Sequence, residues 1–240
     1  MAVIRSAIFT CMVFLSTAVF SVLVMVTRLF GYRAAFRVVV VWAKFVIWMG
    51  GLLCGLSYAA VGQENLPADS AVVLMKHSSA YETVVQILLF PTQVWVLKRE
   101  LLLVPFFGWG LAASQPIAVN RKAGRNAVNQ VIRVGKKRLA EGRWVIIFPE
   151  GTRMPAGQTR RYGVSGVLLA QAAGKLIVPV AHNAGDFWPR RGWLKRTGTV
   201  RFAIGPPIDP AGREPREVND EVQAWIEAKV AELRREDGFI

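Results

Sequence analysis

The chain is 240 residues long, carries a formal net charge of +14 at pH 7 and is 53% apolar. Its mean hydropathy of +0.34 is too high for an ordinary soluble protein, and its length suits one α/β domain with an appendage. The charge is concentrated in residues 65–205, where twenty basic residues outweigh six acidic ones. A basic domain beside an apolar N-terminus indicates contact with anionic lipid headgroups or acidic substrates. No nucleic-acid-binding motif accompanies the charge, so we expect no nucleic-acid partner.

Two apolar runs open the chain. Residues 7–26 are uncharged over twenty residues, which is long enough to cross a bilayer as a helix, and the second run covers residues 38–61. The link between them, residues 28–37, holds three arginines, and such basic links tend to stay cytoplasmic. Either the first helix crosses alone, or both lie in one leaflet as a monotopic anchor. We expect a membrane-anchoring helical segment over residues 1–62, retained because it lacks a signal-peptide cleavage pattern.

After residue 62, short apolar runs rich in β-forming residues alternate with helical patterns. Their nearly continuous apolar character is typical of strands that are buried on both faces. This alternation predicts an α/β fold, a mixed sheet flanked by helices, in a domain that covers residues 63–240. The expected strands are 71–76, 94–99, 116–121, 144–150, 176–182 and 199–205, and the expected helices are 79–90, 123–141, 164–174 and the acid-rich tail after Pro215.

Polar residues fall where four of these strands end. His77 follows the first strand, Lys98 and Arg99 end the second, Arg121 ends the third, and residues 149–153 follow the fourth. In open α/β sheets, ligands bind beyond the carboxyl ends of the strands. We therefore expect these side chains to converge on one edge of the sheet.

The stretch KHSSAYET, residues 76–83, holds one of the two histidines, His77, and Glu82 five residues later. Residues five apart within one helix point about 140° apart, so we expect His77 in the loop before the helix and Glu82 in its first turns. There the carboxylate can hold one ring N–H of His77 and leave the other nitrogen as a base. Ser79 and Glu82 also match a capping box, S-x-x-E, which explains the glutamate without catalysis. The stretch alone leaves both interpretations open.

Two further stretches present cations. FPEGTR, residues 148–153, follows a buried strand with a turn that presents Arg153, a side chain suited to gripping phosphate. The alternative is an ordinary turn with a surface arginine. VLKRELLLVPFFGWG, residues 96–110, places Lys98 and Arg99 before a strongly apolar run. That pattern fits a substrate with a phosphate and an acyl chain, and the alternative is a core helix with solvated flanking charges.

These blocks, together with VPVAHNAG at residues 178–185, resemble in order and spacing the glycerolipid acyltransferase family. The resemblance is greatest to its bacterial 1-acylglycerol-3-phosphate (lysophosphatidate) acyltransferases and covers about residues 65–205 and the apolar N-terminal pair. It implies transfer of a fatty acyl group from acyl-ACP or acyl-CoA to the sn-2 hydroxyl of lysophosphatidate, giving phosphatidic acid. It implies no cofactor beyond that co-substrate, and a place at the bacterial inner membrane with the catalytic domain facing the cytoplasm.

The resemblance also implies residue roles. His77 falls on the catalytic base and Glu82 on the acid that orients it, while His182 is expected to support the site. No metal is expected, because two histidines without nearby cysteines make a zinc site improbable. The substrate-binding candidates are Lys98, Arg99, Glu150, Gly151, Thr152 and Arg153, with Lys98 and Arg153 on positions associated with the substrate phosphate.

Two positions depart from the family pattern. The family usually has Asp where this chain has Glu82, and Gly163 stands where relatives often carry a lysine, a charge that Arg160 or Arg161 can supply. Two alternatives therefore stay open. One is an acyltransferase of the same family that acts on another lyso-lipid, such as lyso-ornithine lipid. The other is a non-catalytic membrane lipid-binding protein, with Glu82 as a sign of lost activity.

Overall fold

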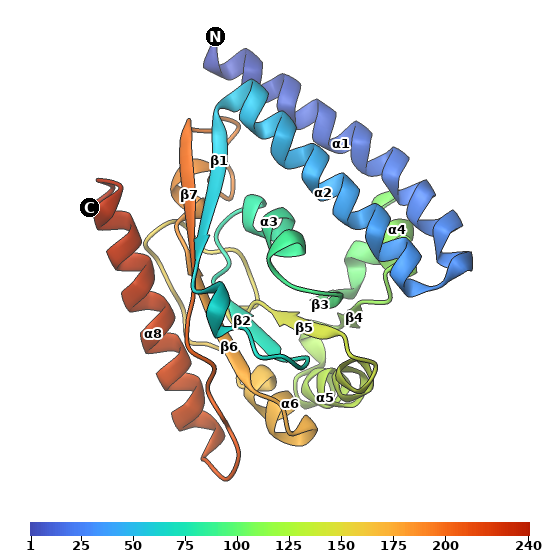
Figure 1. The fold of residues 1–240 in the computed structure, drawn as a ribbon, viewed down its shortest axis with the longest axis vertical. Helices are drawn as coiled ribbons and strands as arrows, with labels where there is room; N and C mark the ends of the chain where they lie inside the picture. Colours follow the sequence, from blue (N-terminus) through green and yellow to red (C-terminus); the bar gives the residue numbers. More distant parts are fainter.

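Two long helices open the computed structural model, which describes residues 1–240. Helix α1 spans Ala2–Thr27 and helix α2 spans Tyr32–Cys54, with the 3₁₀ helix η1 at Arg28–Phe30 between them. They pack together as a hairpin along one side of the α/β domain (Figure 1). Both are long and apolar enough to cross a membrane. The first apolar run thus forms α1, and most of the second forms the later part of α2.

Helix α1 contacts the domain near both of its ends. Near its start, Phe9 is completely buried and packs edge-on against Trp188, with ring centroids 5.4 Å apart. Near its end, the backbone of Ser21 lies so close to Gly110 that an added Cβ atom would sit 2.9 Å from the Ser21 Cα. The helix therefore lies beside the domain instead of extending away from it. Its outward side is apolar and exposed, as at Phe14.

A seven-stranded sheet forms the centre of the domain, in the order β1-β7-β6-β2-β5-β3-β4. Strands β6 and β7 pair antiparallel, and the other neighbouring strands pair parallel. The sheet is therefore mixed, which confirms the predicted fold class. The strands are β1 Leu56–Val61, β2 Val72–Met75, β3 Gln93–Lys98, β4 Ile117–Val119, β5 Trp144–Ile147, β6 Ile177–His182 and β7 Gly198–Ile204.

Helices flank this sheet (Figure 1). Helix α3 contacts α2, whereas α5 and α6 pack together and α8 packs against β6. The central strands β2, β5 and β6 are buried along their whole length. Their own side chains are mostly branched and apolar on both faces of the sheet, as is typical of strands covered on both sides. The helices are α3 Tyr81–Leu89, α4 Phe107–Ala113, α5 Arg125–Ala140, α6 Ser165–Ala173, α7 Ala184–Phe187 and α8 Pro215–Glu236, with the 3₁₀ helices η2 Gln63–Asn65, η3 Arg99–Leu103 and η4 Arg121–Ala123.

The helical segment ends earlier than the expected boundary at residue 62. Helix α2 stops at Cys54, and the next residue, Gly55, has φ of 62°, a left-handed conformation that favours glycine. Residues 56–61 then form β1, which pairs parallel with β7 at the edge of the sheet. The apolar run to Val61 therefore belongs partly to the sheet. The chain passes from the last turn of α2 into the edge strand β1 with only Gly55 between them.

Candidate active site

His77 lies in the loop between β2 and α3, at the carboxyl end of a central strand. Its Nδ1 lies 2.8 Å from Oε1 of Glu82, and its ring stacks on Phe148 with centroids 4.0 Å apart. The side chain of His77 is 12% exposed and that of Glu82 is fully buried. His77 therefore precedes the helix and Glu82 lies in its first turn, as the five-residue spacing predicted.

Glu82 both holds the His77 ring and accepts backbone N–H groups at the start of α3, the two roles that the sequence left open. Its Oε1 accepts hydrogen bonds from the backbone N–H groups of Ser78 and Ser79 at 3.2 and 3.0 Å, as well as facing the His77 ring. The hydroxyl of Ser79 in turn accepts from the N–H of Tyr81 at 3.0 Å. The carboxylate thus caps the start of α3 and holds the histidine, so one interaction fixes the loop and the ring together.

The electrostatics of this pair favour a neutral histidine. Burial lowers the pKa of His77 below its ordinary value, although the hydrogen bond to Glu82 acts in the opposite direction. Burial on its own would raise the pKa of Glu82, but the hydrogen bonds from His77 and from the backbone N–H of Ser79 hold it below its usual range. An ionised Glu82 fixes the proton of His77 on Nδ1. The free nitrogen, Nε2, is then available to accept a proton.

A buried ionic cluster supports the loop from behind. The Nζ of Lys76 lies 2.7 Å from Oε1 of Glu150 and 2.8 Å from Oε1 of Glu227. The other carboxylate oxygen of Glu150 accepts the backbone N–H of His77 at 2.8 Å. Burial raises the pKa of Glu150, and the charge of Lys76 opposes this rise. Glu150 was expected to bind substrate, but both of its oxygens are engaged inside the protein, so it positions His77 instead.

His182 is completely enclosed beside this loop. Its Nε2 lies 2.8 Å from the carbonyl oxygen of Lys76, and its Nδ1 accepts the N–H of Ala184 at 3.2 Å. Burial lowers the pKa of His182. Both ring nitrogens are occupied by backbone groups, which leaves none for a substrate. The supporting role expected of His182 stays a prediction.

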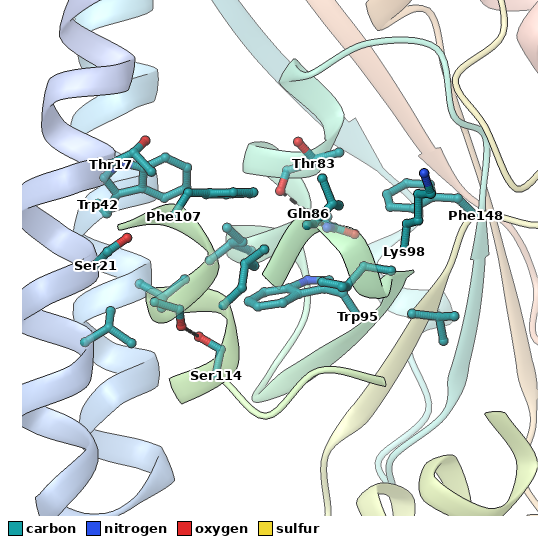
Figure 2. A pocket seen from close by; sticks show the side chains of 18 of the residues that line it. Thr17, Ser21, Trp42, Thr83, Gln86, Trp95, Lys98, Phe107, Ser114 and Phe148 are labelled. Atoms are coloured by element: carbon teal, nitrogen blue, oxygen red, sulfur yellow. Dashed lines mark hydrogen bonds between the residues drawn. The ribbon is translucent and has the colours of Figure 1, made fainter. Parts of the chain in front are cut away.

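A cavity of about 220 Å³ opens next to His77 and extends toward the N-terminal helices. Residues from α1, α2, α3, β3 and α4 line it, and most of them are apolar. Lys98 and Phe148 lie at one end, whereas Thr17, Ser21 and Trp42 lie at the other (Figure 2). The cavity thus has a cationic end beside the histidine and an apolar remainder against the helix pair.

Three cations share the cavity lining with His77, namely Lys98, Arg121 and Arg153. They follow β3, β4 and β5, and His77 follows β2, so neighbouring parallel strands deliver all four to one edge of the sheet. This confirms the expected convergence. Arg153 forms no salt bridge with an acidic residue of the protein, although it lines the cavity together with His77.

The remaining candidates lie outside the cavity lining. Arg99 is exposed at the start of η3, and Gly151 and Thr152 are partly buried in the loop after β5. The carbonyl of Gly151 accepts a hydrogen bond from the guanidinium of Arg121, so this loop helps to position that arginine. Arg121 was recognised only as a strand-end residue and not as a binding candidate. The sequence did not predict that side chains from α1 and α2 line the cavity, because only tertiary packing brings these helices to the site.

The geometry of these residues is typical of one class of active site. A neutral histidine, oriented by a buried carboxylate, stands where three cations meet an apolar cavity. Such a histidine can act as a general base toward a hydroxyl group. The cations suit a phosphate, and the cavity suits a hydrocarbon chain. The arrangement therefore suits an enzyme that acts on a hydroxyl of an anionic, chain-bearing substrate.

Comparisons with known proteins identify the family. The acyltransferase family model matches residues 58–183. A 1-acyl-sn-glycerol-3-phosphate acyltransferase from Pseudomonas aeruginosa is 43% identical over 206 residues, which covers 84% of this chain and 80% of that protein. The protein of the same name from Borreliella burgdorferi is 31% identical over 169 residues, covering 69% of this chain and 66% of that protein. The chain therefore belongs to the acyltransferase family, and its reaction is acyl transfer.

A solved structure supports the fold. The 1-acyl-sn-glycerophosphate (LPA) acyltransferase PlsC from Thermotoga maritima matches with a TM-score of 0.80 and covers 97% of this chain and 96% of that one. The two sequences are 21% identical. The match therefore extends over the N-terminal helix pair as well as the α/β domain.

Proposed function

We propose that this acyltransferase moves a fatty acyl group from a thioester, acyl-ACP or acyl-CoA, to the sn-2 hydroxyl of 1-acylglycerol-3-phosphate, with His77 as the general base. The relatives named above carry the corresponding acceptor in their names. The observation that carries the proposal is the 2.8 Å contact between His77 and Glu82 at the cationic end of an apolar cavity. In this proposal the cations bind the phosphate of a lysophosphatidate, His77 faces its free hydroxyl, and the apolar cavity takes an acyl chain.

In the proposed reaction no acyl-enzyme forms. Nε2 of His77 takes the proton of the acceptor hydroxyl as the oxygen attacks the thioester carbonyl carbon. The new C–O bond forms, the C–S bond breaks, and the proton held by His77 passes to the departing sulfur. General-base assistance of this kind contributes roughly 10²- to 10⁴-fold to the rate. Glu82 stabilises the imidazolium that forms during the attack.

The acceptor phosphate is assigned to the cationic end of the cavity. The side chains of Arg153, Lys98 and Arg121 all line this end. A phosphate held there places the neighbouring glycerol hydroxyls beside His77. Positioning of this kind converts an encounter into an oriented, effectively intramolecular step. The apolar part of the cavity then takes an acyl chain.

The helix pair is assigned to the membrane. The outward side of α1 and α2 exposes large apolar residues, and Arg33 and Arg37 are exposed at the start of α2. Because α1 contacts the domain near both ends, the pair suits insertion into one leaflet as a monotopic anchor. We place it in the cytoplasmic leaflet of the bacterial inner membrane, with the domain on the cytoplasmic side. The exposed basic residues of α5, such as Arg133, suit an acidic carrier protein.

The test is acylation by purified protein in vesicles, with lysophosphatidate, lyso-ornithine lipid and lysophosphatidylethanolamine as competing acceptors. We expect lysophosphatidate to be preferred, and we expect Arg153→Ala to raise its KM by about 10-fold, as loss of a charged hydrogen bond implies. Arg216→Ala is the matched control, since it removes an exposed arginine from α8, a helix that does not line the cavity. Preference for another lyso-lipid would overturn the assigned acceptor, and absence of turnover with every acceptor would support a lipid-binding role.

A further inference from the structure

A long uncharged segment follows β3. Residues 101–119 contain no charged side chain, and basic residues stand on both sides, with Lys98 before the segment and Arg121 after it. The first part of the segment exposes large apolar side chains, namely Leu101, Leu103, Val104, Phe106 and Trp109. Contiguous apolar surface of this kind marks a contact with a membrane or with another protein. Residues 101–109 therefore form an apolar surface on the α/β domain itself, apart from the helix pair.

The backbone of this surface turns sharply at Phe106. Phe106 has φ of 61° and ψ of −64°, and the N–H of Phe107 donates to the carbonyl of Pro105 at 2.7 Å. This geometry is a γ-turn of the rare, strained kind, which a bulky aromatic residue seldom adopts. The rings of Phe106 and Trp109 lie 5.0 Å apart, and both side chains are nearly half exposed. The strained turn thus holds an aromatic pair at the surface, and tryptophan is enriched where proteins meet the membrane–water interface.

The same segment also forms part of the cavity wall beside His77, through Leu101, Phe107 and Leu111. Leu101 lines the cavity and is 38% exposed, so it stands where the cavity meets the surface. Lys98 also lines the cavity, and its side chain is 49% exposed. An apolar and a cationic residue, three positions apart, therefore border the cavity at the surface. A phosphate that carries a hydrocarbon chain matches both of them.

Residues 101–109 lie next to the exposed apolar surface of α1. Helix α4 begins among them, at Phe107, and packs against α1 (Figure 1). The contact is close because Gly110 has no side chain, and an added Cβ atom would sit 2.9 Å from the Cα of Ser21. Large apolar side chains that follow Ser21 on α1 are exposed as well, namely Val22, Leu23, Met25 and Val26. The apolar surface of the monotopic anchor therefore continues onto the α/β domain.

We propose that residues 101–109 insert into the leaflet that holds α1 and α2 and form the apolar border of the cavity opening, where the acceptor lipid enters. This inference deepens the proposed function and rests on it. Lys98 and Arg121, which flank the uncharged segment, then lie at the level of the headgroups, where the acceptor phosphate lies too. The donor thioester is soluble in water and does not pass this border. Residues 101–109 thus act on the delivery of the acceptor and not on proton transfer.

The first test measures depth in the bilayer. A spin label on Leu103→Cys is placed in phosphatidylethanolamine–phosphatidylglycerol vesicles, and its collisions with oxygen, which enters hydrocarbon, are compared with those of a water-soluble nickel complex. Cys11 is exposed and is replaced by Cys11→Ala, whereas Cys54 is buried. We expect oxygen to dominate at position 103 and the nickel complex to dominate at Arg216→Cys, the matched control on α8 at the opposite side of the domain (Figure 1). Access by the nickel complex at position 103, or by neither reagent because a second protein surface covers it, would overturn the inference.

The second test measures delivery of the acceptor. Leu103 is 80% exposed and does not line the cavity, so Leu103→Glu adds a charge at the proposed bilayer contact without changing the cavity. The KM for long-chain lysophosphatidate in vesicles should rise about 10-fold, because a carboxylate is costly in hydrocarbon. The KM for hexanoyl-lysophosphatidate dissolved as monomers, and that for the thioester, should change by less than about twofold. Leu103→Met keeps an apolar side chain and should retain the wild-type KM values.

The two acceptors separate delivery from other effects. A rise in KM for both acceptors would show that the new charge repels the phosphate, and this result would overturn the inference, as would an unchanged KM for both. Either result would leave the proposed function intact, because turnover of lysophosphatidate by the wild type is measured in the same assay. Absence of turnover by the wild type with every acceptor would overturn both.

Discussion

The change Glu82→Gln tests the electrostatic role of the carboxylate with little change of shape. Oε1 of Glu82 receives the ring nitrogen of His77 and two backbone N–H groups at 2.8 to 3.2 Å, whereas Oε2 has no partner. A glutamine can keep its oxygen in the first position and place its amide nitrogen in the second. The loop and the start of α3 should therefore fold as before, and only the negative charge beside His77 is lost.

The structure sets the size of the effect. A hydrogen bond to a charged group contributes about 1.5–3 kcal/mol, roughly twice a neutral one. Glutamine keeps a neutral hydrogen bond, so the charge itself accounts for about half of that, roughly 0.75–1.5 kcal/mol of stabilisation of the imidazolium in the transition state. Because about 1.36 kcal/mol corresponds to a factor of ten, kcat should fall about 4- to 10-fold. The phosphate contacts lie at other residues, so the KM for lysophosphatidate should change by less than about threefold.

The pH profile gives the result that separates this role from a structural one. His77 must be neutral to act, and burial holds its pKa below about 6.5, so wild-type activity should persist below that pH before it declines. Glu82 raises the pKa of His77, so Glu82→Gln should move the acidic limb of kcat to lower pH. The assay is initial-rate acylation of lysophosphatidate in vesicles between pH 4.5 and 8. An unchanged kcat with an unmoved limb would refute the assignment of Glu82 as the orienting group.

Three further outcomes follow from the same structure. Arg121→Ala removes a charge that lowers the pKa of His77, so the acidic limb of kcat should move to higher pH, and a shift to lower pH would contradict this electrostatic effect. Lys76→Met leaves Glu150 as an uncompensated buried charge and should cost about 3–5 kcal/mol in thermal unfolding, whereas an unchanged Tm would show that the cluster is not coupled to stability. His77 and His182 are buried with lowered pKa values, so the unfolded chain binds more protons than the folded one below about pH 6.5, and Tm should fall as pH drops through that value. A constant Tm between pH 7.5 and 5.5 would contradict it.

Much of the fold could be predicted because local patterns decide it. The central strands are continuous apolar runs, and such runs are typical of parallel strands buried on both faces. The polar residues that follow them converge because β2, β5, β3 and β4 are neighbouring parallel strands, whose carboxyl ends lie at the same edge of the sheet. The spacing of His77 and Glu82 excluded a shared helix face, and the observed loop-and-first-turn geometry follows from it. The two interpretations of Glu82 were compatible, since one oxygen serves both the cap and the ring.

The parts that were missed depend on side-chain direction and on contacts distant in sequence. Glu150 and Arg153 stand three residues apart in one motif, yet the first points into the protein and the second into the cavity. No spacing rule distinguishes these directions in a turn. The meeting of Ser21 with Gly110 joins segments about ninety residues apart, so sequence alone did not show that α1 completes the cavity. Strand β1 was hidden within an apolar run that continues from α2.

The central claim is that His77 is the general base for acyl transfer to lysophosphatidate. The direct measurement compares thioester-dependent phosphatidic acid formation by the wild type and by His77→Ala in vesicles, alongside the binding of lysophosphatidate to each. The account predicts that turnover falls by at least about 100-fold while the Kd for lysophosphatidate changes by less than about threefold. Turnover by His77→Ala at the wild-type rate would contradict the account and leave the loop of residues 76–80 as a helix cap beside some other chemistry.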